Sequence, residues 1–521
     1  MRLLAIMRAD FFIRLRRPST VVVFLLLSAV PYLWIPDPST GRTLFQISGH
    51  RAIYNSAAIG MATAVLGTLF IGLVGFYVVS NALKRDVVSR CGYVIGSTTM
   101  RGSEYIAGKF AGNVAFLTIF TLGYMTTAMV MVLVRGEAPL QPLLFAKQYA
   151  LLLPPAIVFV SAAAIFFECT PLLRTKFGDV LYFFVWLSLM GFAATMIEQG
   201  VAVRWARYFD VSGLGFLLEH MKSRYHTESM SIGASAFDRA KAPVVFTGLD
   251  VDYTWLLPRI VTMLWPLALL AAARLFFHRF DPARVRAVAS ASSRTWAGRF
   301  NAMAKPLARL LTSLLPRGGS SSLLGAARAD AIATIDAFPL VVVGVIAFAI
   351  AALASDAHAL FTGVLPVAFA ACAISIADIS CREKRAGTTA LVYAAPSLRT
   401  HFVWWKFASA LLVASAFLAV PLARAITLRP PAAPALLSAV IFTCAAATTL
   451  GTVSANAKTF IVSFLTFWYI ATQDKGATPS LDFANFFGHT TPTVTAAYLA
   501  TSAAALTTAH LLHTRTLAAK W

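Results

Sequence analysis

The chain has 521 residues, of which 58% are hydrophobic and only 13% charged, and its mean hydropathy is +0.73. Soluble globular domains carry about a quarter charged residues, so this composition excludes an ordinary soluble enzyme. The 44 Lys and Arg residues against 22 Asp and Glu give a net charge of +22. In a soluble protein that surplus would indicate nucleic-acid binding, but Lys and Arg also gather in the cytoplasmic loops of membrane proteins. We therefore expect an all-α polytopic membrane protein with no nucleic-acid partner.

Twelve apolar runs are long enough, or nearly so, to cross a bilayer as helices. They cover residues 19–35, 57–82, 110–134, 148–167, 179–197, 254–277, 339–354, 358–378, 407–428, 434–455, 459–473 and 493–513. If the N-terminus is cytoplasmic, about two thirds of the Lys and Arg residues fall on the cytoplasmic side, as the positive-inside rule requires. We therefore predict a multi-pass protein with both termini in the cytoplasm.

Short matching segments recur in the two halves of the sequence. Leu3–Asp10 matches Leu323–Asp330, and each segment lies just before the first span of a half. Other residues match at a constant spacing. Arg85, Asp86 and Lys109 correspond to Arg382, Glu383 and Lys406, each 297 residues further on (382 − 85 = 297). Lys176 and Trp186 correspond to Lys458 and Trp468 at a spacing of 282 residues (458 − 176 = 282). Matches in one order, at equivalent places in the topology, indicate an internal repeat.

The repeat predicts two six-helix halves in the same orientation, each preceded by an amphipathic interfacial helix. Residues 1–277 form the first half, with an outer loop at about 199–253, and residues 323–521 form the second. The linker 278–322 is basic, and its stretch 299–315 alternates cations with apolar residues at helical spacing, which predicts an amphipathic helix on the membrane surface. Parallel repeats place a substrate path at the interface between the halves.

Enzyme signatures do not occur in the sequence: there is no phosphate loop, zinc-protease pattern or nucleophile elbow. We expect no catalytic residue, metal ion or cofactor in this chain. Ionisable residues are also scarce at span centres, where an ion-coupled carrier needs them. Glu168, at the cytoplasmic end of a span, is the one carboxylate that we single out, and pairing with Arg174 or Lys176 at the interface is its simpler interpretation. Arg259 lies where a long side chain can reach water.

The cytoplasmic loops between the second and third spans of each half share one layout. An Arg-acid pair is followed by a short amphipathic turn, a breaker and a basic residue at the next span, which is typical of a short helix on the membrane surface. A plain basic loop would explain the cations but not the parallel layout. The residues that we single out for this role are Arg85, Asp86, Glu104, Lys109, Arg382, Glu383, Gly387, Thr388 and Lys406.

On these residues the chain resembles bacterial type-two ABC export permeases. The coupling loop of that family runs approximately Arg-Glu, Gly-Thr, Leu, then Pro and a Lys that opens the third span. The second half fits with Arg382, Glu383, Gly387, Thr388, Leu391, Pro396 and Lys406. The first half departs from the pattern, because Asp86 replaces Glu, Gly92 is displaced and Thr99 stands where Pro would be.

The resemblance implies a permease subunit with both transmembrane halves fused in one chain, located in the bacterial inner membrane. Two copies of a separate ATP-binding subunit would dock on the coupling loops and hold the ATP and magnesium, so this chain would not itself be an enzyme. Export of an amphipathic or hydrophobic substrate, small or lipid-like, would be the function, with membrane lipids as further partners. Charge-assisted contacts of the coupling residues would orient the docking surface.

The substrate path between the halves is predicted to pass Glu168 and six aromatic residues. These are Tyr182, Phe183, Trp186, Phe467, Trp468 and Tyr469. Packing between spans, or contact with lipid, is the simpler interpretation of such aromatics.

Two other classes of function stay open on the sequence. An ion-coupled secondary transporter of the major facilitator type also has two parallel six-span halves, but its loop signature is missing here and central carboxylates are few. A membrane enzyme or scaffold is the other class, with a ligand or partner bound by the polar residues of the outer loop. Those residues are His220, Glu228, Asp238, Asp250 and Asp252, and a solvated polar loop is their simpler interpretation.

Overall fold

The computed structural model divides the chain into two compact units, residues 1–288 and 289–521. It describes residues 2–16, 18–198, 204–227, 229–249, 253–278, 280, 322–337 and 340–518, together with residues 306, 309, 310, 312 and 313. The predicted linker helix 299–315 therefore lies almost entirely outside the described residues. Each unit is treated below by itself.

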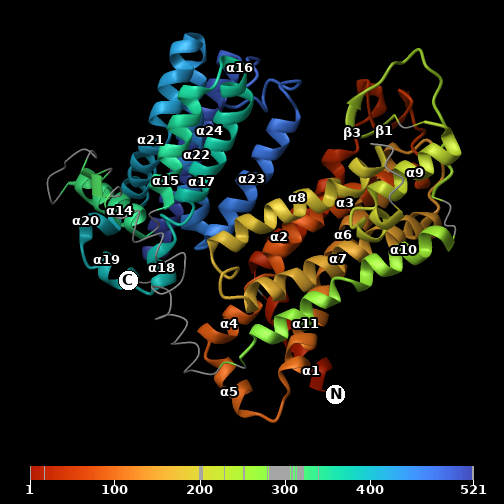
Figure 1. The fold of residues 1–521 in the computed structure, drawn as a ribbon, viewed down its shortest axis with the longest axis horizontal. Helices are drawn as coiled ribbons and strands as arrows, with labels where there is room; N and C mark the ends of the chain where they lie inside the picture. The colour runs from red at the N-terminus through yellow and green to blue at the C-terminus, as the bar shows by residue number, and fades with distance from the viewer. Residues whose placement is uncertain are drawn as a thin grey trace. The chain divides into compact units, whose positions relative to one another are not determined.

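The first unit is a bundle of long helices with a small sheet at one end (Figure 1). Its helices are α1 (Arg2–Leu15), α2 (Pro18–Trp34), η1 (Pro38–Thr40), α3 (Ser56–Val79), α4 (Ala82–Val88), α5 (Cys91–Ser97), α6 (Gly102–Arg135), α7 (Pro142–Cys169), α8 (Lys176–Glu198), η2 (Arg204–Phe209), α9 (Leu214–Tyr225), α10 (Tyr253–Leu264) and α11 (Leu267–Phe276). Helix α3 lies at the centre of the unit and packs against α6, α7 and α8. Its apolar sequence and nearly complete burial explain this position, since it has no polar face to turn outward.

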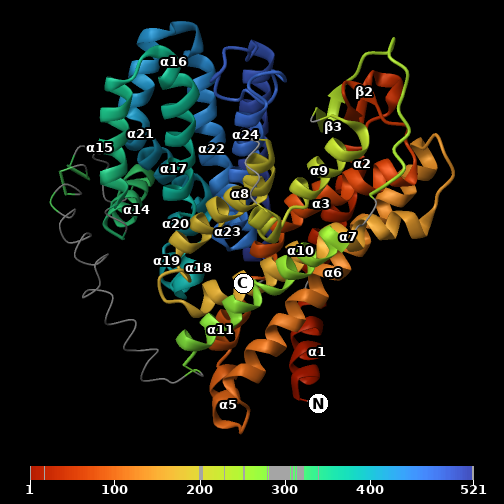
Figure 2. The ribbon, with the colours of Figure 1, turned by 45° about the vertical axis from the view of Figure 1, so that its right-hand side comes forward.

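The second unit is also helical, and its long helices run side by side in two views (Figures 1 and 2). Its described helices are α14 (Leu323–Ala337), α15 (Leu340–Ala354), α16 (Ala357–Ala359), η4 (Leu360–Val364), α17 (Leu365–Ile376), α18 (Arg382–Ala386), α19 (Thr389–Tyr393), α20 (Pro396–Thr400), α21 (Phe402–Leu428), η5 (Pro430–Ala432), α22 (Ala433–Ser454), α23 (Ala457–Gln473) and α24 (Pro492–Ala518). Helix α21 contacts α14, α15, α17 and α22, so it occupies the centre of this unit.

Seven helices in the described part of the chain are long and apolar enough to cross a membrane, and a bent pair brings the number to eight. The pair joins residues 323–336 to 341–354 through an angle of 88°. Among the remaining predicted spans, α2 and α8 are present as shorter apolar helices and α23 has only 17 residues. The chain is therefore an all-α protein with several potential membrane spans, and the number twelve stays a prediction.

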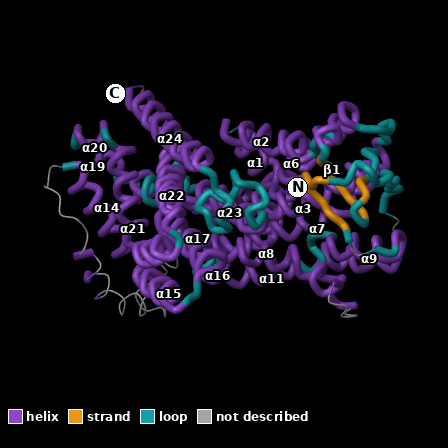
Figure 3. The backbone as a smooth tube through the Cα atoms, turned by 90° about the horizontal axis from the view of Figure 1, so that it is seen from above, coloured by secondary structure: helices purple, strands orange, loops and turns teal. Residues whose placement is uncertain are grey.

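A three-stranded antiparallel sheet joins two segments of the first unit that are far apart in sequence. The strand order is β2 (His50–Arg51), β1 (Arg42–Ile47), β3 (Met230–Ala236), and Phe45 pairs with Ile232. The strands are the orange segments beside α9 in Figure 3.

The prediction of a solvated polar loop at 199–253 is wrong for the part that the structure describes, because apolar side chains such as Phe246 and Leu249 are buried there. Of the polar residues considered as ligands, 228, 250 and 252 lie outside the described residues.

Helix α7 carries two consecutive prolines in its interior, and a buried arginine binds the carbonyl groups beside them. Pro155 has no N–H to donate to the carbonyl oxygen of Leu151, four residues earlier. The Arg259 guanidinium donates to this oxygen at 3.1 Å and to that of Leu152 at 2.9 Å. The expectation that Arg259 reaches water is wrong, since only 6% of the residue is exposed. Apolar surroundings require such freed carbonyl groups to find a donor, and Arg259 provides it.

We expect Arg259→Met to lower the free energy of unfolding by about 1–3 kcal/mol, because buried carbonyl oxygens lose their donor. Thermal unfolding of the detergent-purified chain measures the change. Arg274→Met on the neighbouring helix α11 is the matched control, since Arg274 is exposed. In a Pro155→Ala background, residue 155 regains an N–H for Leu151, so Arg259→Met should cost less there. An equal cost in both backgrounds would contradict the carbonyl argument.

Candidate functional site

Five charged residues of the first unit form a buried cluster, which we call the first ion cluster: Asp10, Arg14, Arg85, Asp86 and Lys109. They come from α1, α4 and α6, and Asp10 is only 1% exposed. The Asp10 carboxylate lies 2.7 Å from the Arg14 guanidinium and 2.8 Å from the Lys109 ammonium, and it also pairs with Arg85. Lys109 lies 2.8 Å from Asp86 as well. The cluster therefore ties the loop helix α4 to both α1 and α6.

Polar neighbours complete the first ion cluster. The Tyr105 hydroxyl donates to Asp86 at 2.6 Å, and Arg14 donates to the Asn113 side-chain oxygen at 2.6 Å. Burial acts to raise the pKa of Asp10, but the nearby cations Arg14, Lys109 and Arg85 outweigh it and hold the pKa below its usual value. A carboxyl group with a lowered pKa stabilises the folded state above its unfolded-state pKa and loses that contribution as the pH falls through the lowered pKa.

The lowered pKa of Asp10 predicts that the stability contributed by this residue depends on pH. We expect the difference in melting temperature between the wild type and Asp10→Asn to be largest near neutral pH and to shrink below about pH 4. Thermal unfolding of both proteins over the acid range measures it. A difference that stays constant into strong acid would contradict the stabilising role of the ionised carboxylate.

Four residues of the second unit form the second ion cluster: Asp330, Arg382, Glu383 and Lys406. The Lys406 ammonium has no exposed surface and lies 3.0 Å from Asp330 and 2.5 Å from Glu383. Arg382 lies 3.6 Å from Asp330 and donates to the Thr334 hydroxyl at 2.6 Å. The cluster joins α18, at the start of the predicted coupling loop, to α14 and α21.

The two clusters contain residues at matching positions of the sequence. Asp10 and Asp330 are 330 − 10 = 320 residues apart, as are the segments Leu3–Asp10 and Leu323–Asp330 that contain them. The other three pairs keep the offset of 297 residues described above. In each unit the aspartate binds both the loop arginine and the span lysine, and that lysine binds the second acid of the loop. The aspartates were matched from the sequence, but their part in the site was not predicted.

A second pair of contacts also recurs at matching positions. The Trp186 indole donates to the carbonyl oxygen of Leu69 at 3.0 Å, and Trp468 donates to that of Pro366 at 2.8 Å. The two tryptophans differ by 468 − 186 = 282 and the two acceptors by 366 − 69 = 297, the offsets already seen in the sequence. Each bond joins a helix of the predicted fifth span to one of the predicted second span.

The other residues predicted along the substrate path are packed within their own units. Tyr182 and Phe183 are fully buried, and Tyr182 stacks on Phe76 with ring centroids 3.5 Å apart. In the second unit, Phe467 packs against Phe483, with ring centroids 5.1 Å apart, and Tyr469 is partly exposed. Their lining of a path between the halves stays a prediction.

Two of the predicted glutamates bind backbone N–H groups at helix beginnings. Glu168 accepts from Ala82 at 3.0 Å and from Leu83 at 2.7 Å, so its carboxylate caps the start of α4. Glu104 accepts from the N–H of Arg101 at 2.8 Å and caps α6. Both residues therefore support the loop helices and span beginnings next to the first ion cluster.

Each predicted coupling loop folds into short helices that expose apolar side chains. We call α4 and α5 (residues 82–97) the first coupling segment and α18 to α20 (residues 382–400) the second coupling segment. Val88 is 75% exposed in the first, and Leu391 is 77% exposed in the second. The acids Asp86 and Glu383 are thus engaged inside the chain, while the outward surface combines apolar side chains with exposed cations such as Arg90 and Arg385.

Gly387 ends α18 with a φ of +71°, which a residue with a Cβ atom adopts only with strain. The following N–H, of Thr388, donates to the Glu383 carbonyl at 3.0 Å. We expect Gly387→Ala to lower the stability of the second unit by about 1 kcal/mol, measured as the melting temperature of the purified chain. Gly363→Ala is the matched control, since both glycines have open space but Gly363 has no positive φ. A smaller cost at position 387 than at 363 would contradict this argument.

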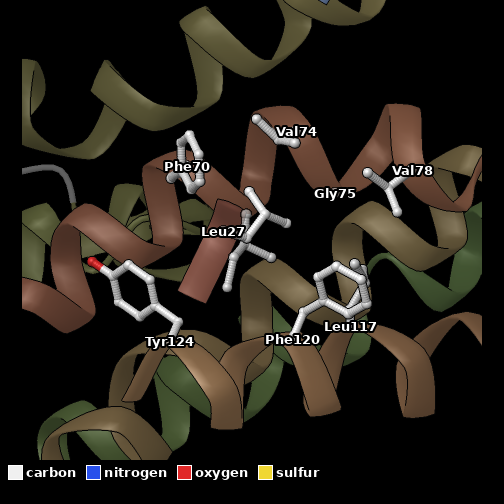
Figure 4. Close-up of a pocket in the computed structure, with 9 residues that line it drawn as sticks. Leu27, Phe70, Val74, Gly75, Val78, Leu117, Phe120 and Tyr124 are labelled. Atoms are coloured by element: carbon white, nitrogen blue, oxygen red, sulfur yellow. The ribbon is translucent and has the colours of Figure 1, made fainter. Parts of the chain in front are cut away.

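An apolar pocket of the first unit lies between α2, α3 and α6 (Figure 4). Its lining residues are Leu27, Phe70, Ile71, Val74, Gly75, Val78, Leu117, Phe120 and Tyr124. No charged side chain reaches it, so it offers contact to apolar groups and no acid-base chemistry. Among the described residues, no three His, Cys, Asp or Glu side chains form a group that could hold a metal ion.

Comparison of the chain with protein-family models, with curated proteins and with solved structures found no match.

Proposed function

We propose that this chain is the permease subunit of an ATP-driven ABC transporter, with both transmembrane halves in one polypeptide. The observation that carries the proposal is the repeated ion cluster. Each predicted coupling loop is fastened by the same arrangement of charges to the helix before the first span and to the third span of its half. A parallel repeat of two six-span halves is the simplest reason for this correspondence.

The ion clusters would transmit force from the coupling segments to the spans. Ion pairs that are shielded from water are strong and geometrically specific when all their members are present. A partner that displaces α4 or α18 would therefore carry α6 or α21 with it. Such a rigid connection is what alternating access requires, because the partner acts on the loop and the substrate moves between the spans.

The partner of this proposal is an ATP-binding subunit in two copies, which supplies the ATP site and the magnesium. Val88 and Leu391 provide apolar contact area on the two coupling segments, and removal of apolar surface from water favours association. The substrate would be an amphipathic or hydrophobic molecule exported between the halves, and the site of action the bacterial inner membrane with both termini in the cytoplasm.

The test is purification of the tagged full-length chain in mild detergent from its native host, with measurement of ATP hydrolysis by the complex. We expect a stoichiometric ATP-binding subunit whose hydrolysis is vanadate-sensitive and rises when lipid is added. A chain that purifies alone, hydrolyses no ATP and moves substrate in response to a proton or sodium gradient would overturn the proposal in favour of an ion-coupled secondary transporter.

A further inference from the structure

The two ion clusters differ at three positions that surround the central aspartate. At the 320-residue offset, Arg14 corresponds to Thr334 (334 − 14 = 320). At the 297-residue offset, Tyr105 corresponds to Phe402 and Gly112 to Ser409 (402 − 105 = 297; 409 − 112 = 297). The second ion cluster thus lacks a guanidinium and a phenolic hydroxyl that the first contains, and it gains the aliphatic hydroxyls of Thr334 and Ser409.

Each missing group removes a contact that a carboxylate oxygen of the first cluster makes. Among the described residues, Oδ2 of both aspartates is buried without a hydrogen bond, but Oδ2 of Asp10 lies 2.7 Å from the Arg14 guanidinium, whereas the cations that bind Asp330 lie nearest to its Oδ1. Asp86 accepts a hydrogen bond from the Tyr105 hydroxyl, whereas Oε2 of Glu383 is likewise buried without a partner in the described part of the chain. Both orphan oxygens belong to carboxylates that bind the Lys406 ammonium through their other oxygen.

The hydroxyl of Ser409 is a third buried oxygen without a partner among the described residues, and the residue has no exposed surface. The matching position of the first unit indicates the direction of the Ser409 side chain. A Cβ atom built at the matching Gly112 would lie 3.4 Å from Oδ2 of Asp10, so the side chain at this position of the repeat is directed at that oxygen. Ser409 also follows Lys406 by three residues on α21 and shares its helix face.

We propose that the second ion cluster binds a monovalent metal cation, Na⁺ or K⁺, between Asp330, Glu383 and Ser409, in the place that the Arg14 guanidinium takes in the first. Carboxylate and hydroxyl oxygens are suitable ligands for hard cations, and water would complete the coordination. Buried oxygen atoms without partners are costly, and a bound ion satisfies three of them at once. The bound cation makes the stability of the second coupling segment depend on the Na⁺ and K⁺ concentration. In the first unit the matching cation is the Arg14 side chain, which is part of the protein and does not dissociate.

The test measures cation binding to the purified full-length chain and needs no ATP-binding subunit. Melting temperatures are compared in sodium, potassium and choline chloride at equal ionic strength, and radioactive sodium is used to count binding sites. We expect one site per chain and a melting temperature about 2–4 °C higher in sodium or potassium than in choline. Equal melting temperatures in all three salts, or stabilisation by acid alone, would overturn the proposal.

Two variants separate this site from general salt effects. Thr334→Arg supplies the guanidinium of the first cluster and should abolish both sodium binding and the difference between salts. Ser409→Gly, which introduces the residue of the first cluster, should weaken sodium binding about tenfold and keeps the test decisive if the arginine variant does not fold. Sodium binding that is unchanged in Ser409→Gly and in a folded Thr334→Arg protein would place the ion elsewhere and refute the site.

Discussion

Replacement of Asp10 by Asn is expected to lower the free energy of unfolding by about 3–5 kcal/mol, as is typical when a buried ion pair loses one partner. The variant leaves Arg85 and Lys109 with Asp86. It leaves Arg14 without its ion-pair partner and with only a longer-range interaction with Glu168. An Asn side chain fills the same space, which means that the loss reports on charge rather than on packing. The measurement is thermal unfolding in detergent, with the monodisperse fraction on size exclusion beside it.

Two further variants test whether charge is the cause. Asp10→Asn combined with Arg14→Met removes one carboxylate and one cation and should recover part of the lost stability. Asp336→Asn changes an exposed aspartate of α14 and should have little effect. If Asp10→Asn unfolds at the wild-type temperature, the cluster does not hold α1, α4 and α6 together and the proposed transmission of force fails with it.

The sequence predicts the helical class of this chain and most of the charged residues of the site, but not their relation to one another. Arg85, Asp86 and Lys109 were expected to orient a surface for a partner, and the structure instead brings them together around Asp10. Helical periodicity and motif spacing are local properties of the sequence. Contacts between residues about a hundred positions apart depend on how the helices pack, so only the match between Asp10 and Asp330 pointed to the aspartates in advance.

The features that the sequence did not predict depend on non-local contacts as well. Strands β1 and β3 pair across more than 180 residues, for example Phe45 with Ile232. Short strands of this kind carry weak signals in the sequence until their partner is known. Arg259 is a similar case, because its burial is explained by two carbonyl groups of another helix, one of which, that of Leu151, is freed by Pro155. A pair of prolines inside an apolar run, together with an arginine in another run, is the signal that would have revealed it.

Leu391→Glu is expected to weaken binding of the proposed ATP-binding subunit about tenfold to a hundredfold, which corresponds to roughly 1–3 kcal/mol at the centre of an interface. Leu391 is 77% exposed on the second coupling segment, so a charged side chain there does not disturb the fold of the free chain. The carboxylate would lose its hydration, or find no cation, in an interface that is apolar at this point. Binding is measured by titration of the purified chain with the ATP-binding subunit, and ATP hydrolysis reports on coupling.

The control for this variant is Leu143→Glu, since Leu143 is 88% exposed at the beginning of α7, and it is Glu168, at the other end of this helix, that contacts the first coupling segment. It introduces the same charge without touching either segment, and the proposal requires binding to stay at the wild-type level. Val88→Glu extends the test to the first coupling segment. Because only the second segment follows the Arg-Glu, Gly-Thr, Leu pattern throughout, a larger loss from Leu391→Glu than from Val88→Glu would show that the two halves contribute unequally to docking. Equal binding by all three variants would mean that the ATP-binding subunit binds another surface of the chain.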